Sequence, residues 1–377
     1  MRFSEIYGND ALKGRLARMV DENRLGHAIL FVEQEGMGAL AFAIALSQYL
    51  NCEHPSGGDS CGECSSCRRH AHLTYPDLHF SFPISASPKL SDSEKKAPIS
   101  SYFLRDWTAL VQENPYFDSH DLYSAIGIEN KAGAITVNEA KDIANTLSLQ
   151  PYESQYKIQI IWEPEKMTTE AANKLLKLLE EPPAGTLFIL VTHKMEKMLT
   201  TVLSRCQIIR LQPVERSEMA AILESKSGLS KEDAMTFATV AAGSVGRAFA
   251  AVANAEGGGQ LEDMVISMLD SSLDKSLSGV LETAEALASL GKDRQKQWCV
   301  TAEGFIRKMF MCSKGLDNIA FASAQETDSI GRLIPRIKES FYDKAAAALD
   351  AALRLIDANV SAKLIFADLA NRFYLYV

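Results

Sequence analysis

The sequence has no long apolar run and no excess of positive charge. Its longest uninterrupted apolar stretch, 39–46, is far shorter than the roughly 20 residues that a membrane-spanning helix needs. The first residues carry charges where a signal peptide would carry an apolar stretch, so we expect a cytoplasmic protein with no membrane partner. The net charge of −9 argues against a protein that grips nucleic acid over its whole surface, although it is compatible with a local basic patch. With 377 residues, 47% of them hydrophobic, the chain can form two or three packed domains.

Cysteine is sparse except in one segment. Four of the seven cysteines lie close together with the spacing C-x8-C-x2-C-x2-C; they are Cys52, Cys61, Cys64 and Cys67. In a chain without a secretory signal, such clustering favours a metal site over disulfides. Four thiolates are the ligand set of a tetrahedral structural zinc ion and leave no open position for catalysis. We therefore predict a structural Zn²⁺ module at 52–67.

Two other readings of the cysteine cluster are open. An iron–sulfur cluster would usually need a further cysteine shortly downstream, and none follows Cys67 before position 206. Four free cysteines in a loop are the simpler alternative. Three histidines lie near enough in sequence to replace a cysteine ligand, although surface positions suit them better; they are His54, His70 and His72.

Short apolar segments alternate with helical patterns in the first half of the chain, which predicts a parallel sheet with helices on both faces. The predicted strands are 27–32, 157–162, 186–191 and 207–211. The predicted helices are 12–20, 39–50 and 168–181, the last of them ended by two prolines.

Composition and periodicity predict three domains. The α/β domain covers 1–213 and carries an insertion at about 84–132, of which 83–101 is rich in Ser, Pro and Lys and reads as a flexible surface loop. Only helical patterns follow, and we expect a small helical lid at 214–256 and a helical oligomerisation domain at 257–377. A triple glycine at 257–259 is a plausible linker between the last two.

The turn between the first predicted strand and its helix has the spacing of a phosphate-binding loop, G-x-x-x-x-G-K-[ST]. Gly36 and Gly38 keep the turn, whereas Glu33 replaces the first glycine and brings a carboxylate near the phosphate position. Ala39 stands in place of the lysine, and Leu40 in place of the hydroxyl that would hold Mg²⁺. We therefore expect neither ATP nor Mg²⁺ to bind.

The second acidic motif of a nucleotide site is altered in the same way. A Walker-B strand ends in Asp-Glu, but this chain has Trp162 at the metal-binding aspartate and retains only Glu163. A simple glycine turn that never bound nucleotide explains the first motif equally well on spacing alone. The agreement of two distant strands favours a degenerate nucleotide site.

Arg205 lies in a short Leu-Ser-Arg-Cys turn, 203–206, before the last predicted strand. An arginine in a turn is usually a solvated surface residue. At a subunit boundary, however, such an arginine can enter a neighbour's ATP site and stabilise the charge of the transition state. The spacing alone does not decide between these two roles.

Several motifs together resemble one family, the AAA+ clamp-loader subunits of bacterial DNA polymerase III. They are F-x-x-I-x-G at 3–8, R-x-x-H-A-x-L-F at 24–31, the four-cysteine module, A-A-N-K-L-L-K-L-L-E-E-P-P at 171–183 and S-R-C at 204–206. A zinc module combined with a degenerate phosphate loop is similar to the delta-prime branch rather than to the ATP-hydrolysing gamma/tau motor. The resemblance is clear over 1–250, and the last third fits only in its helical character.

The resemblance implies an AAA+ core, a lid and a collar domain in a non-hydrolysing stator. Such a subunit works in a pentameric loader that opens the sliding clamp and places it on primed DNA. Its expected partners are the gamma/tau motor subunits and the delta subunit, with clamp and DNA reached through the assembled complex. Arg205 matches the family's trans-acting arginine finger, Thr192 its sensor-1 position and Arg247 its sensor-2 motif.

Two other functions compete with this reading. The first is an ATP-hydrolysing motor with an aberrant phosphate loop, which Ala39, Leu40 and Trp162 disfavour. The second is a zinc-dependent nucleic-acid binder that acts alone, which the net charge of −9 disfavours.

Overall fold

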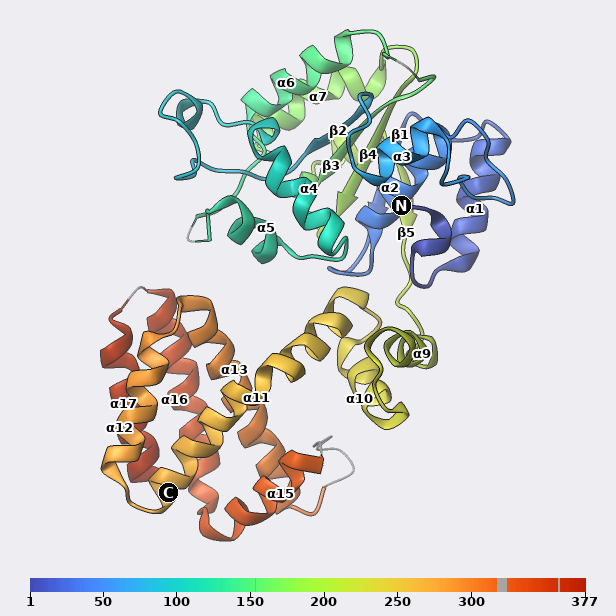
Figure 1. The fold of residues 1–377 in the computed structure, drawn as a ribbon. Helices are drawn as coiled ribbons and strands as arrows, with labels where there is room; N and C mark the ends of the chain where they lie inside the picture. The colour runs from blue at the N-terminus through green and yellow to red at the C-terminus, as the bar shows by residue number, and fades with distance from the viewer. Residues whose placement is uncertain (130, 153, 317–323, 359) are drawn as a thin grey trace. The chain divides into compact units, whose positions relative to one another are not determined.

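Figure 1 shows the computed structural model, which describes residues 1–377 apart from 130, 153, 317–323 and 359. The chain divides into two compact units, Met1–Ala250 and Ala251–Val377. The predicted boundaries at 213 and 256 remain predictions.

The first unit contains a five-stranded parallel sheet in the order β2-β3-β4-β1-β5. Its strands are β1 (Ala28–Val32), β2 (Leu78–Ser81), β3 (Lys157–Trp162), β4 (Thr186–Thr192) and β5 (Gln207–Arg210). Every residue of β3 and β4 is buried, as expected for central parallel strands that are covered on both faces. Four of these strands were predicted, and β2 was not.

Helices cover both faces of the sheet, as two consecutive residues of β1 show, because their side chains point to opposite faces. Leu30 packs in a cluster with Ile143 and Leu175, from the neighbouring helices α6 (Val137–Ser148) and α7 (Thr169–Glu180). Phe31 points the other way and lies 6.4 Å, ring centre to ring centre, from Phe42 of the almost fully buried helix α2 (Ala39–Leu50). The predicted α/β fold is confirmed.

The α-helices of the first unit follow the strands or lie between them. They are α1 (Asp10–Asp21), α2 (Ala39–Leu50), α3 (Ser65–Ala71), α4 (Leu104–Glu113), α5 (Ser119–Ile126), α6 (Val137–Ser148), α7 (Thr169–Glu180), α8 (Thr200–Leu203), α9 (Arg216–Ser227) and α10 (Lys231–Ala241). Shorter 3-10 turns include Phe3–Glu5, Ser100–Phe103 and Pro164–Lys166.

The insertion differs from the flexible surface loop that its composition predicts. Ile84, Ser87 and Leu90 are buried. Ile84 also forms a bridge to Ala134, and α4 and α5 follow in the same segment. Local composition missed these contacts because the partners lie far away in sequence.

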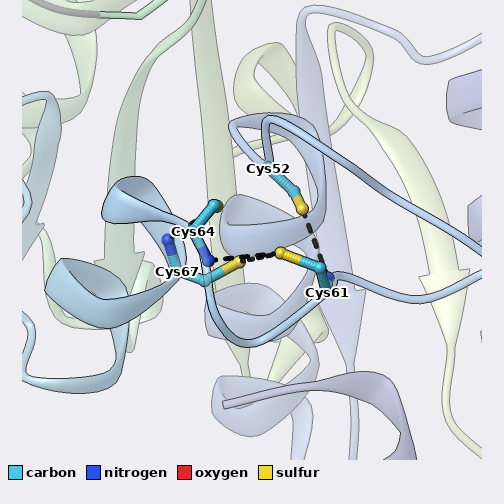
Figure 2. Close-up of side chains that lie close together, drawn as sticks. All are labelled: Cys52, Cys61, Cys64 and Cys67. Atoms are coloured by element: carbon cyan, nitrogen blue, oxygen red, sulfur yellow. Dashed lines mark hydrogen bonds between the residues drawn. The ribbon is translucent and has the colours of Figure 1, made fainter.

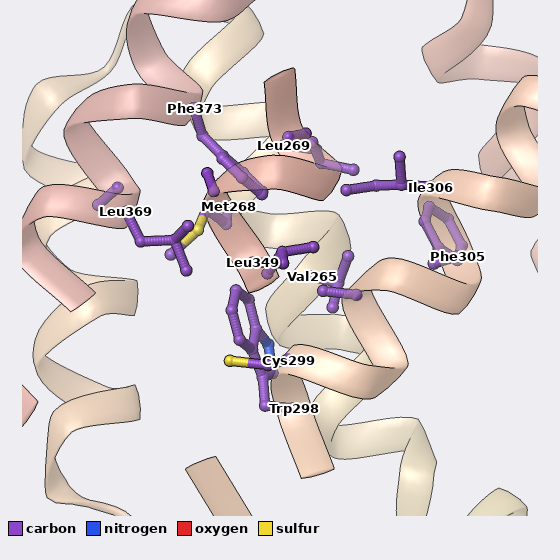
Figure 3. Packing of buried hydrophobic residues seen from close by; sticks show 14 of the residues in the cluster. Val265, Met268, Leu269, Trp298, Cys299, Phe305, Ile306, Leu349, Leu369 and Phe373 are labelled. Atoms are coloured by element: carbon purple, nitrogen blue, oxygen red, sulfur yellow. The ribbon is translucent and has the colours of Figure 1, made fainter. Parts of the chain in front are cut away.

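The second unit is helical, and its core is shown in Figure 3. Its helices are most of α11 (Val245–Leu273), whose first residues belong to the first unit, and α12 (Leu277–Ser289), α13 (Lys292–Ser313), α15 (Ala324–Leu333), α16 (Glu339–Asp357) and α17 (Ala362–Tyr376). Leu349 of α16 packs in this core with Trp298 of α13 and Phe373 of α17. The glycines suggested as a linker, 257–259, fall within the bounds of α11, and their surroundings lie outside the described side chains.

Among the described helices, none is both long enough and apolar enough to cross a membrane.

Candidate functional site

The loop from Glu33 to Gly38 joins β1 to α2 and has the backbone of a phosphate-binding turn. Gly36 and Gly38 have φ values of 82° and 104°, in the left-handed region that glycine adopts without strain. The first N–H groups of α2 have no carbonyl partner within the helix, so this end of α2 is suited to bind an anion. The backbone of this loop thus has the left-handed glycines that a phosphate-binding turn uses, and the degenerate site itself stays a prediction.

The anion at this helix end is the chain's own Glu33. Its Oε2 accepts a hydrogen bond of 2.7 Å from the backbone N–H of Ala39, and the residue is only 7% exposed. Burial raises the pKa of Glu33 to about 7, against the lowering effects of His193 and of the backbone N–H groups of Ala39 and Gly38. A buried carboxylate thus uses a donor that a phosphate would need.

Ala39 and Leu40 are buried apolar side chains at the positions of the lysine and the hydroxyl. Neither side chain has a polar atom that could bind a phosphate or a metal-bound water. The predicted loss of nucleotide chemistry stays a prediction.

Tyr116 of the insertion packs against Gly38 of this loop. A Cβ atom added at Gly38 would lie 2.6 Å from the Tyr116 ring, and one added at Gly246 would lie 2.4 Å from the Tyr116 carbonyl oxygen. The Tyr116 ring also stacks on Tyr7 at 5.9 Å, and its hydroxyl accepts a 3.2 Å hydrogen bond from the Tyr7 backbone N–H. One insertion residue therefore contacts the phosphate loop, the N-terminal segment and the segment that follows α10.

Trp162 stands at the position of the metal-binding aspartate and packs in a buried aromatic cluster. Its ring centre lies 5.8 Å from Trp107, 5.2 Å from Phe117 and 5.6 Å from His193. Trp107 and Phe117 both belong to the insertion. Aromatic side chains thus fill the space beside the degenerate motif.

Glu163 is buried directly after β3 and has two partners. Its Oε1 accepts a 2.6 Å hydrogen bond from Ser119 Oγ, and its Oε2 lies 2.7 Å from the Lys166 ammonium. Burial raises the pKa of Glu163, and Lys166 opposes that rise. The insertion therefore also contacts the second acidic motif.

The two sensor positions lie in different environments. Thr192 is buried at the end of β4, and its hydroxyl donates a 2.8 Å hydrogen bond to Glu165 Oε2. Arg247 is exposed near the start of α11, and its backbone N–H donates to Ser244 Oγ.

Arg205 follows α8 and pairs with Glu180 at the end of α7. Its Nε donates a 2.7 Å hydrogen bond to Glu180 Oε1, its Nη2 contacts the same oxygen, and its Nη1 donates to the Thr201 carbonyl. Both side chains are partly exposed, at 29% for Arg205 and 47% for Glu180. An ion pair this exposed contributes about 0–1 kcal/mol, so little free energy opposes its exchange for another anion.

The four predicted cysteine ligands meet between α2 and α3 (Figure 2). One sulfur from each lies within 4.8 Å of all the others, and the Cys61 and Cys67 sulfurs are 3.8 Å apart. Tetrahedral coordination with Zn–S bonds of about 2.3 Å requires sulfurs about 3.8 Å apart. Backbone N–H groups point at the sulfurs, as from Cys64 to Cys61 at 3.4 Å and from Cys67 to Cys64 at 3.4 Å.

The electrostatics of the cluster also fit a thiolate-bound cation. The backbone N–H groups of Glu63 and Cys64 lower the pKa of Cys61 to about 6, whereas burial raises the pKa of Cys67. A Zn²⁺ ion would remove the need to protonate the buried thiols. The four cysteines therefore fit the predicted ion, which would cross-link the module without a catalytic position.

The histidines near the cluster are not among the grouped ligands of the described residues. His70 instead stacks on Tyr75 with ring centres 4.1 Å apart, and its Nδ1 lies 3.0 Å from the Ser66 carbonyl. It is a core residue of the module.

The cysteine module also holds the start of the chain. Asp59 accepts 2.9 Å hydrogen bonds from the backbone N–H groups of Phe3 and Ser4. Phe3 then packs its ring against Phe42 and Tyr49 of α2. Folding of the module is thereby coupled to the packing of the first residues on α2.

Sequence reasoning missed three residues that the structure brings to the degenerate site. They are Tyr116, Ser119 and His193. The one local signal is the capping box at Asp118 and Asp121, which marks the start of α5 but not its neighbours.

Comparison with known proteins identifies the family of the chain. Residues 8–215, more than half of the chain, match the family described as "DNA polymerase III, delta subunit". DNA polymerase III subunit delta' of Bacillus subtilis (strain 168) is 30% identical over 53% of this chain and 46% of its own length. The subunit of the same name from Escherichia coli (strain K12) is 27% identical over 63% of this chain and 57% of its own length.

DNA polymerase III subunit tau of Bacillus subtilis (strain 168) is 24% identical over 78% of this chain and 47% of its own length. The matches thus span about half the length of these curated relatives. Because the family match covers more than half of the chain, and two relatives are named delta', the chain belongs to the delta-prime family of DNA polymerase III clamp-loader subunits.

Proposed function

We propose that this chain is a cytoplasmic, non-hydrolysing stator of a clamp loader and that it presents Arg205 to the ATP site of an adjacent gamma/tau-type motor. In the assembled loader, together with a delta subunit, it would help to place the sliding clamp on primed DNA. The family and the relatives named delta' and tau support the clamp-loader role. The stator role and the trans arginine are our inference.

The observation that carries the proposal is the Glu33 carboxylate on the α2 end. A phosphate entering the loop would have to displace the buried Glu33 carboxyl group, whose Oε2 accepts a hydrogen bond from Ala39 N–H, or lie beside it. In its ionised form Glu33 would repel the phosphate strongly, because two like charges would lie close together in a buried site. Tyr116 closes the same loop by contact with Gly38, which further disfavours nucleotide binding in cis.

Arg205 has the properties that a trans-acting arginine needs. Its guanidinium contacts Glu180 and the Thr201 carbonyl, and these contacts orient the side chain before a partner arrives. The pair is partly exposed, so a γ-phosphate with more negative charge could replace Glu180 as the partner. Arginines supplied to a phosphoryl-transfer site are worth about 10³–10⁵ in turnover in the best-studied cases.

The deciding experiment measures DNA-stimulated ATP hydrolysis by a loader reconstituted from cognate motor, delta subunit, clamp and this chain. We expect Arg205→Ala to lower turnover by at least about tenfold because transition-state charge in the neighbouring site loses its partner. Arg210→Ala is the matched control, since Arg210 is an exposed arginine on the following strand. Size-exclusion chromatography must first establish that each variant assembles.

Glu180→Gln separates the two roles of the ion pair. If Glu180 only holds Arg205, this variant should keep turnover within about fivefold of wild type, which corresponds to about 1 kcal/mol. Equal turnover for Arg205→Ala and the Arg210→Ala control would refute the trans arginine and leave a scaffolding role.

The alternative function, an ATP-hydrolysing motor, makes a different prediction for the isolated chain. It requires ATP turnover that saturates with ATP and depends on Mg²⁺, whereas the stator proposal expects turnover no higher than the buffer control. Glu33→Ala is the useful comparison, because removing that carboxylate frees the Ala39 N–H without adding a lysine or a hydroxyl.

A further inference from the structure

Three potential metal ligands converge at the carboxyl ends of adjacent strands in the first unit. Glu35 lies in the loop after β1, Glu163 directly follows β3, and His193 directly follows β4. One ligand atom of each lies within 4.8 Å of the other two. The three strands are neighbours in the order β3-β4-β1, so the parallel sheet itself brings the residues together.

His193 is the unusual member of this group. Its side chain is only 6% exposed, and neither ring nitrogen has a hydrogen-bond partner among the described residues. The nearest acidic oxygen, Glu33 Oε1, lies 3.5 Å from Nδ1. Burying an imidazole without hydrogen bonds is costly, and native structures rarely leave such a group unsatisfied. Coordination of a cation would satisfy the ring.

Among the described residues, acidic side chains outnumber basic ones around His193. Glu33, Glu35 and Glu163 approach it, whereas one ammonium, that of Lys166, lies 2.7 Å from Glu163 Oε2. Asp121 and Glu165 add further carboxylates nearby: burial raises the pKa of Asp121, with smaller contributions from Asp118 and Glu35, and Glu165 Oε1 accepts a hydrogen bond from the His193 backbone N–H. A divalent ion would balance this excess.

Ser119 supplies too few protons to satisfy the carboxylates. Its hydroxyl lies 2.6 Å from Glu163 Oε1 and 3.3 Å from Glu35 Oε1, but one hydroxyl donates one hydrogen. Its backbone N–H adds a second, longer contact of 3.3 Å to Glu35. Lone pairs on both carboxylates therefore stay available to an ion.

We propose that Glu35, Glu163 and His193 form a second metal site, which binds a divalent first-row transition-metal ion such as Zn²⁺. One imidazole and two carboxylates are a common donor set for such ions. Metal-bound histidines usually face a carboxylate with the other ring nitrogen, and Glu33 beside Nδ1 supplies that partner. The ion would cross-link the ends of β1, β3 and β4 at the degenerate nucleotide site.

The test counts metal ions bound to the full-length chain. The protein is stripped with chelator, re-equilibrated with low micromolar Zn²⁺, and its zinc content is measured by inductively coupled plasma mass spectrometry. We expect two ions per wild-type chain, one of them in the cysteine module. His193→Gln should bind one, and so should Glu35→Gln, which guards against misfolding of the first variant because Glu35 lies in a half-buried loop.

His79→Gln is the matched control, because His79 is another histidine of the same sheet whose Nε2 lacks a described partner. It should retain two ions. Co²⁺ substitution identifies the site that is lost, since the intense thiolate-to-cobalt absorption of the cysteine module should persist in His193→Gln. One ion per wild-type chain, or two ions in both His193→Gln and Glu35→Gln, would overturn the proposal. Neither result bears on the ATPase test of the stator role.

Discussion

Tyr116 offers the sharpest test of how the degenerate site is closed. The residue is 7% exposed, its ring contacts Gly38 and stacks on Tyr7, and its hydroxyl accepts the Tyr7 N–H. Replacing a buried aromatic residue with alanine costs about 3–5 kcal/mol through lost burial and the cavity left behind. Because Tyr7 is half-buried, water can replace the lost hydrogen bond, so little is added to that range. We expect Tyr116→Ala to destabilise the first unit by about 3–5 kcal/mol.

Tyr116→Phe removes only the hydroxyl and should cost about 0.5–1.5 kcal/mol. Urea unfolding monitored by tryptophan fluorescence measures both variants. A Trp298→Phe background keeps the signal in the first unit, because Trp107 and Trp162 are the two tryptophans that remain. The linear extrapolation of each transition gives the free energy of unfolding.

Hydrogen exchange locates the effect. Amides at 36–39 and 243–250 should exchange faster in Tyr116→Ala, because Tyr116 lies between the phosphate loop and the segment after α10. A loss below about 1 kcal/mol, with unchanged exchange in both segments, would refute the view that the insertion closes the site.

Two further predictions concern the zinc module and a buried carboxylate. Cys64→Ser should weaken Zn²⁺ retention and speed amide exchange at Phe3. It should also lower the melting temperature of the first unit by about 4–8 °C, which corresponds to a loss of about 2 kcal/mol in the free energy of unfolding. A melting temperature that is unchanged after zinc is removed would contradict a structural role. Burial raises the pKa of Glu139, which accepts hydrogen bonds from Ser81 and Ser100, so the folded state holds this proton more tightly than the unfolded state does. The stability that this group contributes is therefore complete below pH 4.5, its ordinary pKa, and is lost as pH rises through the raised pKa. Glu139→Gln should flatten that part of the plot of unfolding free energy, measured in urea, against pH. An unchanged plot would show that the carboxyl group does not titrate on folding.

Local patterns in the sequence predicted much of the core. The apolar run 28–32 and the glycines after it located β1 and its turn, because a buried strand and a left-handed turn each need particular residues. Helix α7 was predicted within one residue at each end, since Thr168 caps its start by accepting from Ala171 N–H and prolines follow its end. The cysteine spacing predicted a cluster that the structure does bring together.

Long-range contacts explain what the sequence did not predict. Strand β2 is short and includes His79, so its four residues lack a clear apolar pattern. Tyr116 and Gly38 are far apart in the chain, and nothing near either residue indicates the other. His193 reads as a polar residue after a strand, and only the strand order β3-β4-β1 reveals its acidic neighbours.

In the proposed stator, the phosphate loop and the second acidic motif must be stable without a nucleotide, and different residues stabilise each of them. The N-terminal N–H groups of α2 have no partner within the helix, and Glu33 supplies an internal acceptor for one of them. At the end of β3, Trp162 and Phe117 fill the space beside the second acidic motif with aromatic rings. Both solutions favour one closed arrangement, whereas the partly exposed pair of Arg205 and Glu180 can exchange partners at little cost. A subunit with a closed site of its own and an exchangeable arginine elsewhere is physically suited to support a neighbour's reaction rather than its own.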